Sequence, residues 1–211
     1  MSRPAWVEID LAALQANYAA AKKAHGGRVF AVLKANAYGH GALACAQALA
    51  TASPPADAFA VAFVEEALPL RAAGITQPIL VLEGAFAADD VQLAAQHQLW
   101  LVTHQAQQLQ LIEQHAGAAL HIWLKVDSGM HRVGFAPHDI AAAHARLAAL
   151  PQVEKVSFLT HLARADELDT PAPTEAQLHA FHTATANLAG WRSLSNSAAI
   201  LAWPQAHQDW G

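Results

Sequence analysis

Cysteine is almost absent from this chain, since Cys45 is the only one among 211 residues. A lone cysteine excludes an internal disulfide and is typical of a reducing compartment. Charged residues are scarce too, at 14% of the chain, and no basic block interrupts a net charge of −5. A nucleic-acid backbone requires a basic surface, so nucleic acid is not an expected partner.

Long apolar runs are also missing. Glutamine, histidine and acidic residues interrupt every alanine-rich segment before it reaches membrane-spanning length, so no membrane association is expected. Glu8 and Asp10 stand where a secretion signal needs an apolar core. With 54% hydrophobic residues, the composition instead suits one large cytoplasmic globular domain with a substantial core.

The thirteen histidines do not form a metal-binding pattern. His179 and His182 lie three residues apart, but no cysteine or carboxylate joins them at ligand spacing, and no HExxH sequence occurs. Buried or surface histidines explain them better, and the sequence predicts no metal site.

The chain does contain a regular alternation of short apolar strands and alanine-rich helices. A first helix is expected to follow Asp10 and to end at the glycine pair 26–27. Strands are expected at 29–33, 58–62, 79–82, 99–102, 120–126, 156–160 and 192–194. The helices that follow them are expected at 41–50, 65–73, 87–97, 105–115, 138–150, 175–188 and from 197.

This alternation predicts an α/β fold with a parallel sheet. No G-x-G-x-x-G loop follows the first strand, which favours a TIM-like (β/α)8 barrel over an open doubly wound sheet. Seven of the eight barrel strands are found. Barrel enzymes hold their chemistry at the carboxyl ends of the strands, so those ends define the candidate site.

Lys34 ends the first of these strands and precedes Tyr38, Gly39 and Gly41. Loss of hydration at the end of an apolar strand disfavours the ammonium form and favours the neutral amine, which attacks aldehydes. The alternative is a lysine that extends its amine to solvent. The aromatic hydroxyl and the glycines that follow favour a Schiff-base lysine.

A second lysine, Lys125, ends the fifth strand on the same face as Trp123 and Asp127. A turn at 127–129 is expected to return Arg132 over the strand end, where two cations would repel each other. The arrangement becomes favourable if Lys125 is a carbamate that accepts hydrogen bonds from Arg132. The alternative is an ion pair between Lys125 and Asp127.

Small polar residues end the seventh strand and open a helix at Ser195, Asn196 and Ser197. Free N–H groups and hydroxyls at such a place suit an anion, and phosphate sites in barrels often follow the seventh or eighth strand. The alternative is a serine that only caps the helix. Glu83 and His104, which end two other strands, are interpreted as solvated rim groups.

Four ordered segments together resemble the motifs of bacterial alanine racemases. They are 31–41 (AVLKANAYGHG), 123–135 (WLKVDSGMHRVGF), 160–167 (THLARADE) and 194–199 (LSNSAA). The resemblance covers essentially the whole chain, and four motifs at these spacings are far more specific than the lysine segment alone.

The resemblance implies a pyridoxal 5'-phosphate barrel of the type called fold III. Lys34 would form the internal aldimine and then act as the base on the D-alanine face of Cα. Tyr38 and Ser197 would bind the cofactor phosphate, with Asn196 beside them. The remaining roles implied are a carbamylated Lys125 that orients Arg132, an Arg132 that contacts the cofactor's phenolic oxygen and the substrate carboxylate, and a His161 beneath the cofactor ring.

The family pattern continues beyond Gly211. It has an Arg-Pro-Gly sequence whose arginine meets the pyridine nitrogen, then a C-terminal β domain whose tyrosine is the second base across a homodimer interface. The resemblance implies that residues 1–10 form a strand belonging with that domain, and that 11–211 form the barrel without its last unit. Such a chain would be inactive or nearly inactive as a racemase alone, because racemisation needs a base on both faces of Cα, while its complete parent would interconvert L- and D-alanine for cell-wall precursors. The alternative function is a non-catalytic fold III barrel that carries pyridoxal phosphate.

Overall fold

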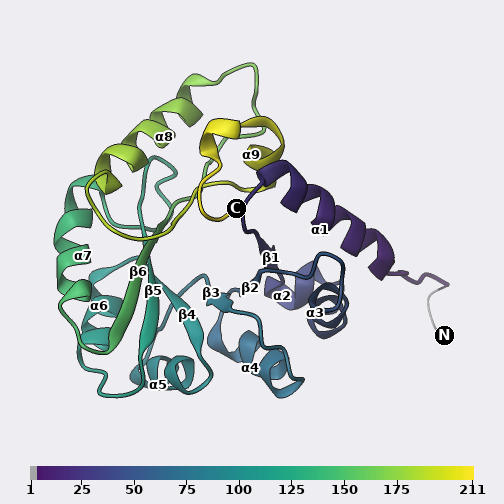
Figure 1. Ribbon diagram of the computed structural model, residues 1–211, viewed down its shortest axis with the longest axis horizontal. Coiled ribbons are helices and arrows are strands. Elements are labelled where there is room, and N and C mark those ends of the chain that lie inside the picture. Colours follow the sequence, from purple (N-terminus) through teal and green to yellow (C-terminus); the bar gives the residue numbers. More distant parts are fainter. Residues whose placement is uncertain (1–3) are drawn as a thin grey trace.

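The computed structural model describes residues 4–211 (Figure 1). The seven strands are β1 (Phe30–Val32), β2 (Ala58–Val61), β3 (Ile79–Val81), β4 (Leu99–Thr103), β5 (Leu120–Lys125), β6 (Val153–Leu159) and β7 (Arg192–Ser193). The helices are α1 (Leu11–His25), α2 (Lys34–Tyr38), α3 (Ala42–Ala50), α4 (Val64–Ala72), α5 (Ala88–Gln96), α6 (Ala106–Glu113), α7 (Ile140–Ala148), α8 (Ala172–Thr185) and α9 (Ser197–Ala202). Short 3-10 turns cover Pro137–Asp139 and Pro204–Ala206.

The strands form one parallel sheet in sequence order from β1 to β7, with helices around its outside (Figure 1). Trp210 occupies the place between the two sheet edges, because it bridges Ser193 on one side and Arg28 on the other. Gly211 continues this contact, since its N–H donates to Arg28 and its carbonyl accepts from Phe30, both over 2.9 Å. The predicted (β/α) barrel with seven strands is confirmed, and the eighth position begins at Trp210.

Two apolar layers follow from the alternation of side chains along the strands. Leu120, Ile122 and Leu124 of β5 lie in the outer layer, between the sheet and its helices. Trp123 of the same strand lies in the barrel interior with Ala58, Ala60, Leu80, Val102, Leu159 and Trp210. The two-face prediction for β5 is therefore confirmed, and one end of the barrel is filled by aromatic rings.

Most predicted elements match within two residues, and the larger differences have local causes. Strand β6 begins at Val153, three residues before the predicted start. Helix α8 begins at Ala172, three residues before its predicted start, and Pro171 and Pro173 flank its first residue. Proline fits the first helical turn, where its missing N–H needs no partner, so these prolines open the helix.

The N-terminal segment lies outside the barrel. Residues 4–10 contain no helix or strand, and Trp6 and Val7 are each 85% exposed. The strand expected in this segment is therefore not formed at residues 6–9, because these mostly exposed residues have no neighbouring strand to pair with among residues 4–211. The rest of the predicted segment, residues 1–3, lies outside the described residues, and the assignment of residues 1–10 to a second domain stays a prediction. Within residues 4–211, none of the helices is both long and apolar enough to cross a membrane.

Candidate active site

A cavity of about 500 Å³ opens at the carboxyl ends of the strands. Part of its lining is apolar and comes from residues such as Val32, Leu82 and Leu159. All the site residues that the family resemblance implied contribute to its lining: Lys34, Tyr38, Lys125, Arg132, His161, Asn196 and Ser197. Residues from four separate motifs therefore share one cavity, as the barrel prediction required.

The turn that carries Lys34 has an unusual backbone. Helix α2 is a single left-handed turn, with φ values of 51°, 55°, 54° and 55° at Ala35, Asn36, Ala37 and Tyr38. Each non-glycine residue in this region costs about 1–2 kcal/mol. The turn leads Lys34 and Tyr38 toward the same space, with the Lys34 Nζ 6.0 Å from the centre of the Tyr38 ring.

This turn is held by hydrogen bonds on both sides. Asn36 Oδ1 accepts from the Ala42 N–H over 2.8 Å at the start of α3. The carboxylate of Glu66, in the first turn of α4, accepts from the Ala35 N–H over 2.8 Å and from the Ala62 N–H over 2.6 Å. Such contacts offset part of the conformational cost and fix the direction of the lysine.

Lys125 is the last residue of β5 and lines the same cavity as Arg132. Burial holds the pKa of Lys125 below its ordinary value, and the charges of Arg132 and Lys34 lower it further, against an opposing effect of Glu83. The alternative pair with Asp127 does not form among residues 4–211, because Asp127 Oδ2 bonds His131 Nδ1 over 3.0 Å and its Oδ1 accepts from the N–H groups of His131 and Gly129. The structure therefore argues against the ion pair between Lys125 and Asp127, and the carbamate interpretation of Lys125 stays a prediction.

His161 follows β6, and a side chain of α8 bonds its backbone. Gln177, 4% exposed on α8, donates to the His161 carbonyl over 3.1 Å and accepts from the Ala163 N–H over 2.9 Å. Burial lowers the pKa of His161, and the charges of Arg132, Lys125 and Lys34 lower it further. The neutral imidazole is therefore the favoured form beside these cations.

The loop after β7 ends at the start of α9. Asn196, not a serine, caps this helix: its Oδ1 accepts from the Ala199 N–H over 3.0 Å, and its Nδ2 donates to the Leu162 carbonyl over 3.0 Å. Because Asn196 supplies the cap, Ser197, which lines the cavity, is not needed for capping. The serine-cap alternative is therefore wrong.

His104 differs from the solvated rim group expected, whereas Glu83 is half-buried at the cavity. His104 is buried at 8% exposure, and its ring Nε2 lies 3.2 Å from the Glu83 carbonyl. Its position follows from Gln108, which bonds the His104 N–H over 2.8 Å and the Glu83 carbonyl over 2.7 Å. Glu83 lines the cavity and is its one carboxylate among the residues described.

Lys34 and Arg132 thus bring positive charge to a cavity in which, among residues 4–211, Glu83 supplies the one carboxylate side chain. This excess of positive charge suits a ligand with anionic groups. The sequence signalled the cations, but it gave no signal for Glu66 or Gln177, whose contacts join residues far apart in the chain.

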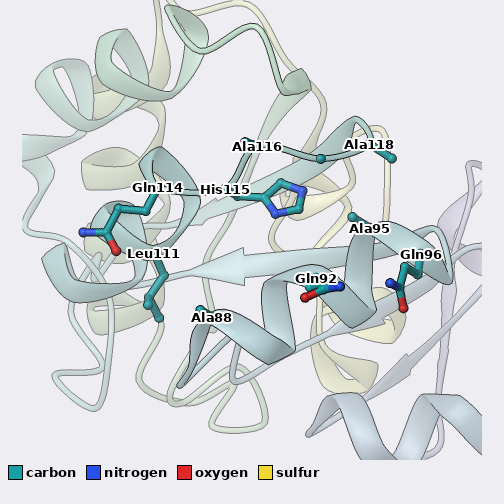
Figure 2. Close-up of a pocket in the computed structure, with 10 residues that line it drawn as sticks. Ala88, Gln92, Ala95, Gln96, Leu111, Gln114, His115, Ala116 and Ala118 are labelled. Carbon is teal, nitrogen blue, oxygen red and sulfur yellow. The ribbon is translucent and has the colours of Figure 1, made fainter.

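A second hollow, of about 530 Å³, lies on the outside of the barrel between α5 and α6 (Figure 2). Its sides carry Gln92, Gln96 and Gln114, and within the described part of the chain its only titratable lining residue is His115 (Figure 2). None of the site residues predicted from the sequence belongs to its lining. The cavity at the barrel mouth is therefore the candidate active site.

Comparison with known proteins identifies the family of this chain. Residues 9–211 match the family model described as alanine racemase, N-terminal domain. The alanine racemase of Aromatoleum aromaticum is 55% identical over 99% of this chain and 58% of that protein. The catabolic alanine racemase of Pseudomonas aeruginosa is 54% identical over 99% of this chain and 57% of that protein.

Solved structures of alanine racemases have the same fold as this chain. The biosynthetic alanine racemase from Pseudomonas aeruginosa has a TM-score of 0.90 and 45% identity over 96% of this chain and 56% of that chain. The Corynebacterium glutamicum alanine racemase has a TM-score of 0.86 and 31% identity over 96% of this chain and 60% of that chain. This chain spans a little over half the length of the curated relatives it matches. By its sequence and its fold, the chain belongs to the family of alanine racemase N-terminal domains.

Proposed function

We propose that this chain is the cofactor-binding part of a pyridoxal 5'-phosphate-dependent alanine racemase. One observation carries the proposal: Lys34, at the end of β1, shares a cavity with Lys125, Arg132, His161, Asn196 and Ser197. The names of the relatives supply the reaction, the interconversion of L- and D-alanine. The complete enzyme would be a cytoplasmic homodimer that supplies D-alanine for peptidoglycan, with residues 1–10 part of its second domain.

The residues present fit the cofactor. The cavity combines a lysine amine, a phenol, a guanidinium and serine hydroxyls with apolar walls, and its volume lies in the range of small-molecule sites. An aldehyde needs the amine, a phosphate needs the hydroxyls and cations, and a flat ring needs the apolar walls. When bound, pyridoxal phosphate would withdraw electrons from the attached amino acid and so acidify its Cα proton.

Each side chain then has a defined task. Lys34 would bind the cofactor covalently and, once released, move a proton at Cα on the D-alanine face. Tyr38 and Ser197 would bind phosphate with Asn196 beside them, and His161 would lie beneath the ring. Arg132 would hold the substrate carboxylate and the cofactor's phenolic oxygen, oriented by a carbamylated Lys125.

Proton exchange at Cα tests this proposal. The chain, supplied with pyridoxal phosphate in deuterated water, is expected to exchange the Cα proton of D-alanine faster than that of L-alanine, because Lys34 serves one face. Lys34→Ala should abolish the exchange, whereas Lys23→Ala, at an exposed lysine of α1, should retain it. Cofactor bound without exchange at either enantiomer would contradict catalysis and favour the non-catalytic carrier.

A further inference from the structure

The left-handed turn after Lys34 contains no glycine at its four strained positions. Its internal hydrogen bonds close the turn on itself: the Ala37 N–H donates to the Leu33 carbonyl over 2.7 Å, and the Gly39 N–H to the Ala35 carbonyl over 3.1 Å. These bonds set the shape of the turn. They do not set its orientation relative to the neighbouring strand, which decides where Lys34 and Tyr38 point.

Glu66 supplies that orientation. Its Oε1 accepts from the N–H of Ala35, the residue next to Lys34, over 2.8 Å. Its Oε2 accepts from the N–H of Ala62 over 2.6 Å and from that of Phe63 over 3.3 Å. Ala62 directly follows β2, the neighbour of β1, so one carboxylate ties the lysine turn to the adjacent strand end and to the first turn of α4.

Three N–H donors converge on this side chain, which requires acceptors at both of its oxygens. Only a carboxylate meets the requirement, because glutamine would present an NH₂ group to one of the donors. Asp90 of α5 offers a comparison within the fold. Its Oδ2 accepts from the N–H groups of Phe86 and Ala87 over 2.8 and 3.0 Å, which closes a helix start but reaches no lysine turn.

We propose that Glu66 is a positioning residue for the cofactor lysine: its carboxylate fixes the left-handed turn so that Lys34 and Tyr38 face the cavity together. The proposal rests on the proposed function in taking Lys34 as the cofactor lysine. Glu66 itself does not line the cavity, since its oxygens are engaged by the backbone.

The test compares Glu66→Gln and Glu66→Asp with two matched controls. Glu65→Gln changes an exposed charge in the same helical turn, and Asp90→Asn neutralises a carboxylate at another helix start, away from the lysine. Pyridoxal phosphate is titrated into each 211-residue chain and followed by the visible absorbance of the lysine-bound cofactor. Glu66→Gln should weaken binding at least about tenfold, since it unpairs one backbone donor of the turn. Glu66→Asp should recover part of the affinity, and the controls should bind like the parent.

Backbone hydrogen exchange in the cofactor-free chain provides a readout independent of the cofactor. Glu66→Gln should speed exchange at Ala35 and Ala62, whereas Glu65→Gln should not. Unchanged exchange and unchanged affinity in Glu66→Gln would overturn the proposal, as would an equal loss of affinity in Asp90→Asn. If the parent chain binds no cofactor at Lys34, the proposed function fails, while the exchange rates still decide whether Glu66 fixes the turn.

Discussion

Gln177 Nε2 donates a hydrogen bond to the backbone carbonyl of His161 over 3.1 Å. The same buried amide accepts from the Ala163 N–H over 2.9 Å and lies 3.4 Å from the Ser128 hydroxyl. One side chain of α8 thereby connects the loop after β5 with the loop after β6. Both loops contribute residues to the cavity, so the shape of the site depends on a residue outside it.

Replacing Gln177 should therefore destabilise the fold and the site together. Gln177→Leu removes the partners of the half-buried His161 carbonyl and of the Ala163 N–H, and each lost hydrogen bond costs about 0.5–1.5 kcal/mol. Chemical denaturation should show a fall of that size or more in the free energy of unfolding. Thr183→Leu, at an exposed position of the same helix, should change it by less than about 0.5 kcal/mol. Equal effects of the two substitutions would refute this account of Gln177.

Lys125 should carry a carbamate when bicarbonate is present. Carbon dioxide adds to a neutral amine, and burial together with Arg132 lowers the pKa of Lys125, so more neutral amine is available than at an exposed lysine. With isotopically labelled bicarbonate, nuclear magnetic resonance should show a carbamate carbon that Lys125→Ala removes and Lys23→Ala retains. A parent spectrum without this signal at ample bicarbonate would rule the modification out.

Mild acid should destabilise the fold through His121. Burial lowers the pKa of His121 to about 3, and Lys155 contributes to the decrease. Its ring Nε2 lies 2.9 Å from the Ser157 hydroxyl inside the barrel. An unfolded histidine has a pKa of about 6.5, so the unfolded state binds the proton first, and stability is lost as the pH falls from about 6.5 toward 3.

The size of this effect follows from the difference in proton uptake. Between pH 7 and pH 5, His121 alone should reduce the free energy of unfolding by about 2 kcal/mol. His121→Gln, which does not titrate, should shrink the measured pH dependence by that amount. His138→Gln, at an exposed histidine, is the matched control. A pH dependence that is the same in parent and His121→Gln would show that His121 does not remain neutral in the fold.

The elements of the fold could be predicted because each is encoded locally. Strand β5 alternates Leu120, Ile122 and Leu124 with inward-facing neighbours, and the structure places these two sets in the two apolar layers. The position of the cavity could be predicted too, because parallel strands bring their carboxyl ends to one end of the barrel. Lys34 and Lys125 reach the same cavity in this way.

The left-handed turn could not be predicted in this way. Ala35 and Ala37 have no intrinsic preference for positive φ, and their conformation depends on contacts such as that with Glu66, 31 positions away from Ala35. The assignment of His104 to the solvated rim failed for a similar reason, because Gln108 and the Glu83 carbonyl draw it inward. Side-chain hydrogen bonds to backbone groups, some of them far away in the chain, decide these positions.

The most direct test of the central claim is borohydride reduction of the chain in the presence of pyridoxal phosphate, followed by peptide mapping. The account predicts one dominant reduced adduct, at Lys34, because Lys34 shares a cavity with Tyr38, Arg132 and Ser197, while the other lysine of that cavity, Lys125, is expected to be a carbamate. Lys34→Ala should remove that adduct without moving it to Lys125. Adducts scattered over exposed lysines, or one centred elsewhere, would contradict a preformed cofactor site at the mouth of this barrel.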